Sequence, residues 1–347
     1  MLQFKENQAK EFENVVSQTH QSVEILNDRV LGQVVSYSDQ WFADATNLLK
    51  PTAPVRDATR FTHAGAWYDG WETRRHNTEE YDWVIFKAGV HAARIIGCEV
   101  DTAFFNGNHA PAISVQALRH EDAASAPSDI SEKDVRWTDV IEKVECGPSQ
   151  RHFFLREALT DDHYNYFKLK MYPDGGIARF RLYGKVVAPE QAAASAKPID
   201  LCSIANGAVA IAVSDQHFGS ANNLIMPGRG HDMSDGWETS RSRTPGHVDW
   251  AIIRLGKLTS YIDRIIVDTA HFRGNFPQFI KVESIAVDGT TAAPHHDDPK
   301  WTTLVDKSKA GPDKEHEYKI DKVLQITHVK LTIIPDGGVK RIRVFAT

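Results

Sequence analysis

The chain contains two copies of one pattern, and this duplication constrains its fold more than any other feature. The heptapeptide DGWETRR at residues 69–75 returns 166 positions later (235 − 69) as DGWETSR at residues 235–241. The tetrapeptide PDGG at residues 173–176 returns at residues 335–338, and other short segments return in the same order. Two copies with so long a period indicate a duplicated domain rather than a solenoid. Each copy is therefore expected to have its own core.

Composition places the chain among ordinary globular proteins and excludes several classes of partner. Its 347 residues are enough for two domains, and 41% of them are hydrophobic and 25% charged. A net charge of −6 predicts no binding to nucleic acid or to an acidic membrane surface. We expect no secretory signal and no membrane span, because no apolar run approaches the roughly 20 residues that a spanning helix needs.

Cysteine usage favours a cytoplasmic protein. Cys98, Cys146 and Cys202 are an odd number of cysteines and lie far apart in the sequence. Such spacing fits a reducing compartment and argues against a disulfide framework or a zinc cluster.

The segment boundaries follow from composition and from the matched motifs. Residues 1–187 are predicted to form a polar lead, with a short helix over residues 6–20, followed by the first repeat. Residues 188–199 are rich in alanine and proline and indicate a linker. Residues 200–347 are predicted to form the second repeat.

Within each repeat the hydrophobic pattern predicts β-strands. Residues 167–171 and residues 329–333 alternate strictly between apolar and polar side chains, as strands with one buried face do. The PDGG segments indicate turns, because proline presets φ and glycine accepts a positive φ. Several short strands with turn punctuation predict an all-β protein of two tandem β-sandwich domains. Repeat length and irregular loops favour a jelly roll over an immunoglobulin pattern.

The order of motifs in each copy resembles the galactose-binding-like jelly rolls of the discoidin and coagulation-factor type. The whole chain is more closely similar to the allantoicase family. This resemblance rests on four long segments of the first repeat: GAWYDGWETRRHN at 65–77, FFNGNHAP at 104–111, ECGPSQRH at 145–152 and MYPDGGIARF at 171–180. It implies hydrolysis of allantoate to ureidoglycolate and urea during purine breakdown. It also implies a homo-oligomer, with a hexamer suggested, and no organic cofactor, while dependence on a divalent metal stays open.

Such chemistry requires particular side chains. Allantoate has one carbon that carries a carboxylate and two ureido groups. Release of urea needs a proton on the departing nitrogen and a base that activates water or helps the second ureido group to form an imine. The carboxylate favours the planar fork of arginine, and the ureido groups favour carboxylates and amides.

These requirements select candidates mainly in the first repeat. The expected catalytic residues are Glu72, His109, His63 and Asp101. The expected substrate-binding residues are Arg74, Arg75, Asn106, Asn108, Arg241 and Glu238. A structural interpretation applies to the immediate neighbours of Glu72, because Asp-Gly-x-x-Thr forms a loop corner in non-enzymatic members of the superfold. Asp69, Gly70 and Thr73 are therefore interpreted as structural, and Trp71 and Trp237 as packing residues.

His109 is distinguished by its absence from the second copy, where Phe276 occupies the matching place. The fold cannot require it, and imidazole exchanges protons near neutral pH, although a lone loop histidine is more often a solvated surface residue. Asp101 and its counterpart Asp268 each end a predicted buried strand. Burial would raise the pKa of such a carboxyl, but a bond to a backbone amide is the alternative that we favour.

No metal site is predicted. Residues 295–298 (HHDD) resemble a run of metal ligands, but flanking prolines and adjacent histidines favour an exposed acidic loop. The alternative to an enzyme is a non-catalytic, tandem carbohydrate-binding-type β-sandwich protein. Such a protein should keep one ligand loop in both copies. The differences at His109 and Phe276, at Arg74 and Ser240, and in residues 56–63, which the second copy mostly lacks, therefore favour the enzyme.

Overall fold

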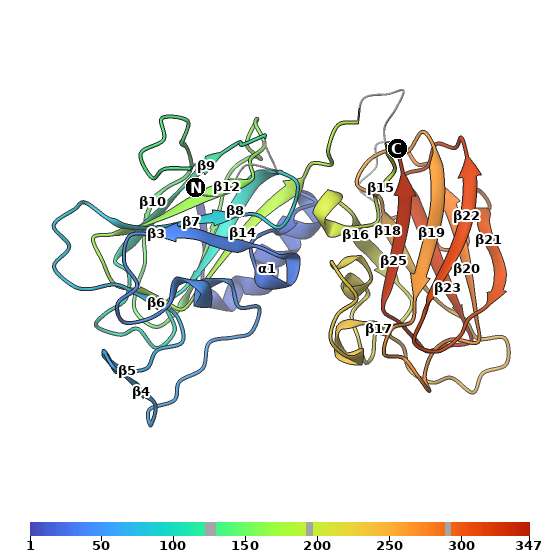
Figure 1. The fold of residues 1–347 in the computed structure, drawn as a ribbon, viewed down its shortest axis with the longest axis horizontal. Coiled ribbons are helices and arrows are strands. Elements are labelled where there is room, and N and C mark those ends of the chain that lie inside the picture. The colour runs from blue at the N-terminus through green and yellow to red at the C-terminus, as the bar shows by residue number, and fades with distance from the viewer. Residues whose placement is uncertain (122–129, 192–196, 289–292) are drawn as a thin grey trace. The chain divides into compact units, whose positions relative to one another are not determined.

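The structure, a computed structural model, describes residues 1–121, 130–191, 197–288 and 293–347. It divides into two compact units, residues 1–187 and residues 188–347 (Figure 1). Residues 192–196 of the expected linker lie outside the described part of the chain. No helix among the described residues is both long and apolar enough to cross a membrane.

The first unit is built almost entirely of strands. Its strands are β1 Leu2–Phe4, β2 Val23–Glu24, β3 Gln33–Tyr37, β4 Phe61–Thr62, β5 Gly65–Ala66, β6 Trp71–Glu72, β7 Asp82–Lys87, β8 Ala93–Asp101, β9 Ala112–Leu118, β10 Thr138–Glu145, β11 Arg151–Leu155, β12 Tyr166–Tyr172, β13 Gly176–Ile177 and β14 Arg179–Val186. Its helical segments are η1 Glu6–Gln8, α1 Ala9–Asn14, η2 Val15–Thr19, η3 Asp28–Val30 and η4 Ala45–Leu49.

Two antiparallel sheets face each other in this unit. One has the strand order β1-β11-β8-β14-β2 and the other β10-β9-β12-β7-β3. The alternation expected from the sequence places Phe167, Leu169 and Met171 of β12 in the core, with Phe180 and Leu182 of β14 on the facing sheet. Each such buried side chain contributes about 1.5–3 kcal/mol. The hydrophobic pattern thus dictates the sandwich.

The second unit repeats this plan with fewer additions. Its strands are β15 Ile199–Asp200, β16 Val209–Val213, β17 Trp237–Glu238, β18 Asp249–Arg254, β19 Ile262–Asp268, β20 Phe279–Ile285, β21 Thr302–Lys309, β22 Glu315–Lys322, β23 His328–Ile334, β24 Gly338–Val339 and β25 Arg341–Ala346. Its helical segments include η6 Ile204–Asn206, η7 Ala221–Ile225 and η8 Met233–Asp235.

Strand order proves the duplication at the level of topology. The sheets of the second unit run β22-β19-β25-β15 and β21-β20-β23-β18-β16. These orders match β11-β8-β14-β2 and β10-β9-β12-β7-β3 of the first unit, strand for strand. The predicted fold class, an all-β chain of two jelly-roll sandwiches, is confirmed.

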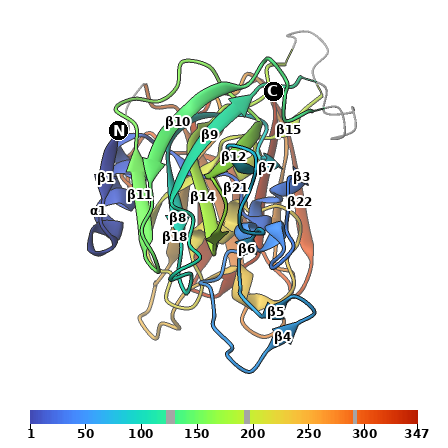
Figure 2. The ribbon, with the colours of Figure 1, turned by 90° about the vertical axis from the view of Figure 1, so that its left-hand side faces the viewer.

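The N-terminal lead packs against the first sandwich. Residues 6–19 are helical, as expected, and α1 lies beside β1 and β11 (Figure 2). Phe12 and Val16 pack with Ile96 and Phe153 of the β11-β8-β14 sheet. The sequence interpretation missed β1, which extends this sheet by pairing with β11.

Residues 51–68 form a projection that includes the hairpin of β4 and β5, seen in blue below the first sandwich in Figure 1. Phe61 of β4 lies in this projection and is 70% exposed to solvent.

Candidate functional site

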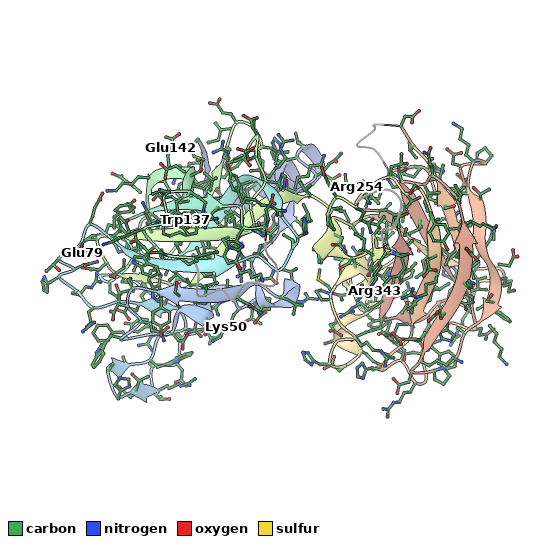
Figure 3. All side chains as sticks on the ribbon, turned by 45° about the horizontal axis from the view of Figure 1, so that its top comes forward. Lys50, Glu79, Trp137, Glu142, Arg254 and Arg343 are labelled. Carbon is green, nitrogen blue, oxygen red and sulfur yellow. The ribbon has the colours of Figure 1, made fainter. Side chains whose placement is uncertain are left out.

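The Asp-Gly corner of the first repeat is a structural anchor. Asp69 accepts hydrogen bonds from Lys50, which is labelled in Figure 3, at 2.9 Å and from the buried Arg179 at 2.6 Å. Trp71 is fully buried, and its Nε1 donates to the carbonyl of Asp39 at 2.8 Å. These contacts agree with the structural interpretation of the corner.

The PDGG turn, residues 173–176, packs against the corner at residues 69–73. Its two glycines permit this close approach because they have no side chains. Gly175 has a φ of 144°, in the region that only glycine adopts readily, and its N–H donates to Thr73 Oγ1 at 3.2 Å. A Cβ on Gly176 would collide with the ring of Phe105. The turn therefore packs directly on the loop that follows β8.

Three of the expected site residues meet at this junction. Asn108 Nδ2 donates to Glu72 Oε1 at 2.7 Å. Arg75 Nη1 donates to Asp174 Oδ1 at 2.9 Å, and its Nη2 donates to the carbonyl of Gly107 at 3.4 Å. Loop 106–109 is thus held from two sides, by a carboxylate and by a guanidinium.

Burial alters the chemistry of Glu72. Its side chain is 8% exposed, and this burial raises the pKa of the carboxyl, while the Asn108 hydrogen bond and the Arg75 charge act in the opposite direction. A carboxyl with a raised pKa is suited to exchanging a proton closer to neutral pH.

The second repeat makes the same contacts. Asn275 Nδ2 donates to Glu238 Oε1, and Arg241 Nη1 donates to Asp336 Oδ1 at 3.2 Å. Arg241 also reaches the carbonyl of Gly274 at 3.4 Å. The network of Glu72, Asn108 and Arg75 is accordingly a property of the duplicated scaffold.

His109 has no counterpart in that shared network. Its Nδ1 lies 2.9 Å from the carbonyl oxygen of Asn106, which only accepts, so Nδ1 carries the hydrogen in the neutral ring and Nε2 the lone pair. His109 forms a bridge with Gly176, whose other neighbour is Glu72 in β6. Glu72 and His109 are therefore backbone neighbours of the same short strand, β13.

His109 also lines a cavity of about 580 Å³ at the adjoining ends of β9, β10 and β12. The polar groups around this cavity include Lys143, Glu145 and Tyr172. Glu72, Arg75 and Asp101 are not among its lining residues.

Asp101 and His63 make other contacts. Asp101 Oδ1 accepts the N–H of Ala103 at 2.8 Å, as Asp268 accepts that of Ala270, and burial raises the pKa of Asp101. This bond is the backbone alternative considered for Asp101. His63 is exposed in the projection, with its ring 5.6 Å from that of Trp41.

Arg74 lies on the same side as His63. Its guanidinium packs over Trp41 and pairs with Asp39 at 3.1 Å. Its backbone N–H also donates to Asp39, as that of Ser240 donates to Asp215.

Sequence reasoning missed Asp174, Lys143 and Tyr172. A signal for Asp174 was present, because the aspartate recurs in both PDGG segments, but it was interpreted only as part of a turn. Tyr172 differs from its counterpart Ile334, so a comparison of the two copies could have found it, whereas Lys143 recurs as Lys307 and gives no such signal.

Among the described residues, one group brings three metal-ligand atoms within 4.8 Å of one another: His295, His296 and Asp297. His295 and Asp297 are exposed, as expected for this loop, and pair with each other. The corresponding loop of the first repeat, residues 131–133, carries serine, glutamate and lysine. This group lies in the second repeat and is no part of the junction around His109.

Comparison with known proteins matches both repeats to one family. The allantoicase repeat family matches residues 23–187 and 199–347. The chain is 60% identical to the allantoicase of Saccharomyces cerevisiae over 96% of each chain. It is 51% identical to the allantoicase of Neurospora crassa, with 94% of this chain and 91% of the relative covered.

Among solved structures, the crystal structure of the Saccharomyces cerevisiae allantoicase matches the fold with a TM-score of 0.82. Sequence identity in that comparison is 57%, and the match covers 100% of this chain and 99% of the other.

Proposed function

The chain belongs to the allantoicase family, and we propose that it hydrolyses allantoate to ureidoglycolate and urea as a step of purine degradation. A family match over both repeats, together with 60% identity to a full-length relative, supports this activity. The reaction breaks one carbon–nitrogen bond. The oxygen of water bonds to the central carbon, and the departing nitrogen leaves with a proton as part of urea.

We assign the chemistry to the first repeat. His109 acts as the base, because its Nδ1 hydrogen is engaged by Asn106 and its Nε2 carries the lone pair that accepts a proton from water. The protonated His109 then passes this proton to the departing ureido nitrogen. Glu72, whose pKa is raised by burial, does not line the cavity beside His109 and acts as a positioning residue through Asn108. Asn108 holds Glu72 in place by its 2.7 Å hydrogen bond. Arg75 fixes the loop that carries His109.

The single observation that carries this assignment is the difference between His109 and Phe276. Loop residues on either side of each position keep matching contacts, with Asn108 bonded to Glu72 and Asn275 bonded to Glu238. Because the second repeat folds with a phenylalanine at this place, the scaffold does not require a histidine there.

The direct experiment incubates purified protein with allantoate and follows urea release. Formation of urea and ureidoglycolate in equal amounts, with no organic cofactor added, is the expected result. Runs with a chelator and with added divalent metal determine whether a metal contributes. Folded protein that releases no urea under either condition would overturn the proposed activity.

A non-catalytic tandem binding protein is the alternative function. A binding duplication should present equal ligand loops, yet the copies differ at His109 and Phe276, so the enzyme is favoured. Titration calorimetry with simple sugars distinguishes the two functions. Sugar binding without urea release would support the binding protein.

We also propose a homo-oligomer that works in the cytoplasm. The exposed Phe61 and Val55 of the projection offer an apolar surface to a neighbouring copy, and the family resemblance suggests a hexamer. Cys98, Cys146 and Cys202 are buried thiols without a disulfide, which suits a reducing compartment. Light scattering after gel filtration tests the first point, and cell fractionation tests the second.

A further inference from the structure

The cavity beside His109 lies where the two repeats share a backbone register but carry different side chains. In the first repeat Ala112 pairs with Glu145 on one side and with Tyr172 on the other. In the second repeat Phe279 occupies the place of Ala112 and pairs with Lys309 and Ile334. The strand pairing alone therefore establishes that Ala112 and Phe279 are equivalent positions in the two repeats.

The cavity is present in the first repeat because Ala112 is smaller than Phe279, its counterpart in the second repeat. Ala112 contributes a single methyl group at a point where Phe279 contributes a ring. His109 likewise stands where the second repeat has Phe276. Two rings of the second repeat thus correspond to a methyl group and an imidazole around the 580 Å³ cavity of the first.

A lysine shared by both repeats responds to this change. Lys307 Nζ lies 4.5 Å from the centre of the Phe279 ring. Its counterpart Lys143 has only Ala112 at that place, and its Nζ instead lies 4.1 Å from the centre of the Tyr172 ring, over the cavity. In the first repeat the ammonium of this lysine therefore lies against Tyr172, and both residues line the cavity.

The cavity presents one cation and two carboxylates to a small acid that carries amide-like groups. Lys143 supplies a cation, and Glu80 and Glu145 supply hydrogen-bond acceptors. By contrast, Arg74 and Arg75, the arginines expected to hold a carboxylate, already pair with Asp39 and Asp174.

We propose that this cavity is the substrate pocket of the first repeat, in which Lys143 binds the carboxylate of a small ureido acid. Glu145 and Glu80 accept hydrogen bonds from the ureido N–H groups, and His109 faces the carbon that loses urea. Ala112 keeps the pocket open. The inference deepens the proposed function, because it names the groups that would recognise allantoate.

The first test replaces the cation. Lys143→Gln removes a charge-assisted contact to the carboxylate, so KM for allantoate should rise about 10- to 100-fold with a much smaller change in kcat. The matched control is Lys307→Gln in the second repeat, which should leave KM unchanged. Equal KM values for the wild type and Lys143→Gln would overturn the role of Lys143.

The second test closes the pocket with the side chains of the other repeat. Ala112→Phe should abolish most binding, and the double variant Ala112→Phe/Tyr172→Ile reproduces the Phe279–Ile334 pair, which the fold already accommodates. Thermal denaturation checks that each variant folds. A folded double variant with wild-type KM would show that the pocket lies elsewhere.

Calorimetric binding of allantoate separates this inference from the proposed activity. If the wild type releases urea but neither variant changes KM, the pocket is wrong and the activity stands. If the wild type binds allantoate without releasing urea and Lys143→Gln weakens binding, the pocket stands and the activity is wrong. Absence of both binding and urea release would overturn both.

Discussion

The first repeat has His109 before β9 and Ala112 at the start of β9. The second repeat has Phe276 and Phe279 at the equivalent positions of the same scaffold. Around these positions the two repeats make matching contacts, from the asparagine–glutamate bond to the arginine–aspartate pair. Contacts present in both copies are explained by the fold. Residues that differ on an unchanged backbone are better indicators of function.

The largest effect should come from erasing this difference. His109→Phe gives the first repeat the residue of the second, so the fold should tolerate it, while loss of the proposed base should lower kcat about 10²- to 10⁴-fold. Urea release under saturating allantoate measures this change.

Phe276→His is the control in the second repeat and should leave kcat unchanged. A His109→Phe variant with full kcat would show that the asymmetry is not catalytic.

A second difference concerns how deeply each copy buries its Asp–Arg corner. In the first repeat the side chains of Asp69 and Arg179 are 4% and 2% exposed, and their Oδ2 and Nη2 atoms are 2.6 Å apart. In the second repeat the side chain of Asp235 is 25% exposed, and its Oδ2 lies 3.3 Å from Arg341 Nη2. Asp69→Asn leaves a buried guanidinium without its counterion and should cost roughly 3 kcal/mol of stability. Asp235→Asn should cost less, because the carboxylate that it removes is the more exposed of the two, although its partners Lys340 and Arg341 are buried.

Hydrogen exchange resolved to the amides of β14 and β25 measures these two losses separately. Equal losses in the two strands would contradict the link between burial and cost.

The sequence predicted the sandwich because alternation and turn residues are local signals. Residues 167–171 alternate, and the PDGG segment that follows them contains its own turn chemistry, so no long-range information was required. β1 escaped notice because three residues are too few to establish an alternation, and they pair with β11 only through tertiary contact. Glu72, Asn108 and Arg75 were expected in the site, and the structure brings them together.

The sequence did not predict the partners of these residues. The pairing of Arg75 with Asp174 joins residues 99 positions apart. The cavity depends on the register of β9 against β10 and β12, which places Ala112 between Glu145 and Tyr172. Such cross-strand neighbours are set by packing and cannot be inferred from spacing along one strand.

Acid sensitivity provides a third comparison. His328 of the second repeat occupies the register position of Tyr166 in the first, and burial lowers its pKa to about 4, with the Arg254 charge acting in the same direction. The folded state keeps this ring neutral while the unfolded chain takes up a proton below about pH 6.5. Its contribution to stability is therefore complete above that pH and is lost progressively as the pH falls toward 4.

At pH 5 this loss should be roughly 2 kcal/mol, and His328→Tyr should remove it. Urea denaturation at pH 7.5 and pH 5 in the wild type and the variant measures the effect. An unchanged pH dependence in the variant would assign the acid sensitivity to other groups, such as His152 and His316, whose pKa values burial also lowers.

The smallest expected effect concerns Arg75 and Arg241, which make the same contacts in the two repeats. The test asks whether both arginines affect substrate binding equally. Arg75 and Arg241 each reach an aspartate and a loop carbonyl, but only the loop beside Arg75 carries a histidine. Arg75→Lys keeps the charge and loses the planar fork, so loop 106–109 should be held less firmly and KM should rise about tenfold. Arg241→Lys makes the same change beside Phe276 and should alter KM by less than about twofold, since most exposed substitutions have small effects. Steady-state kinetics of the two variants decides the matter. A similar rise in KM for both arginines would mean that the second repeat also holds substrate, and the asymmetry between the copies would then mark the acid–base step alone.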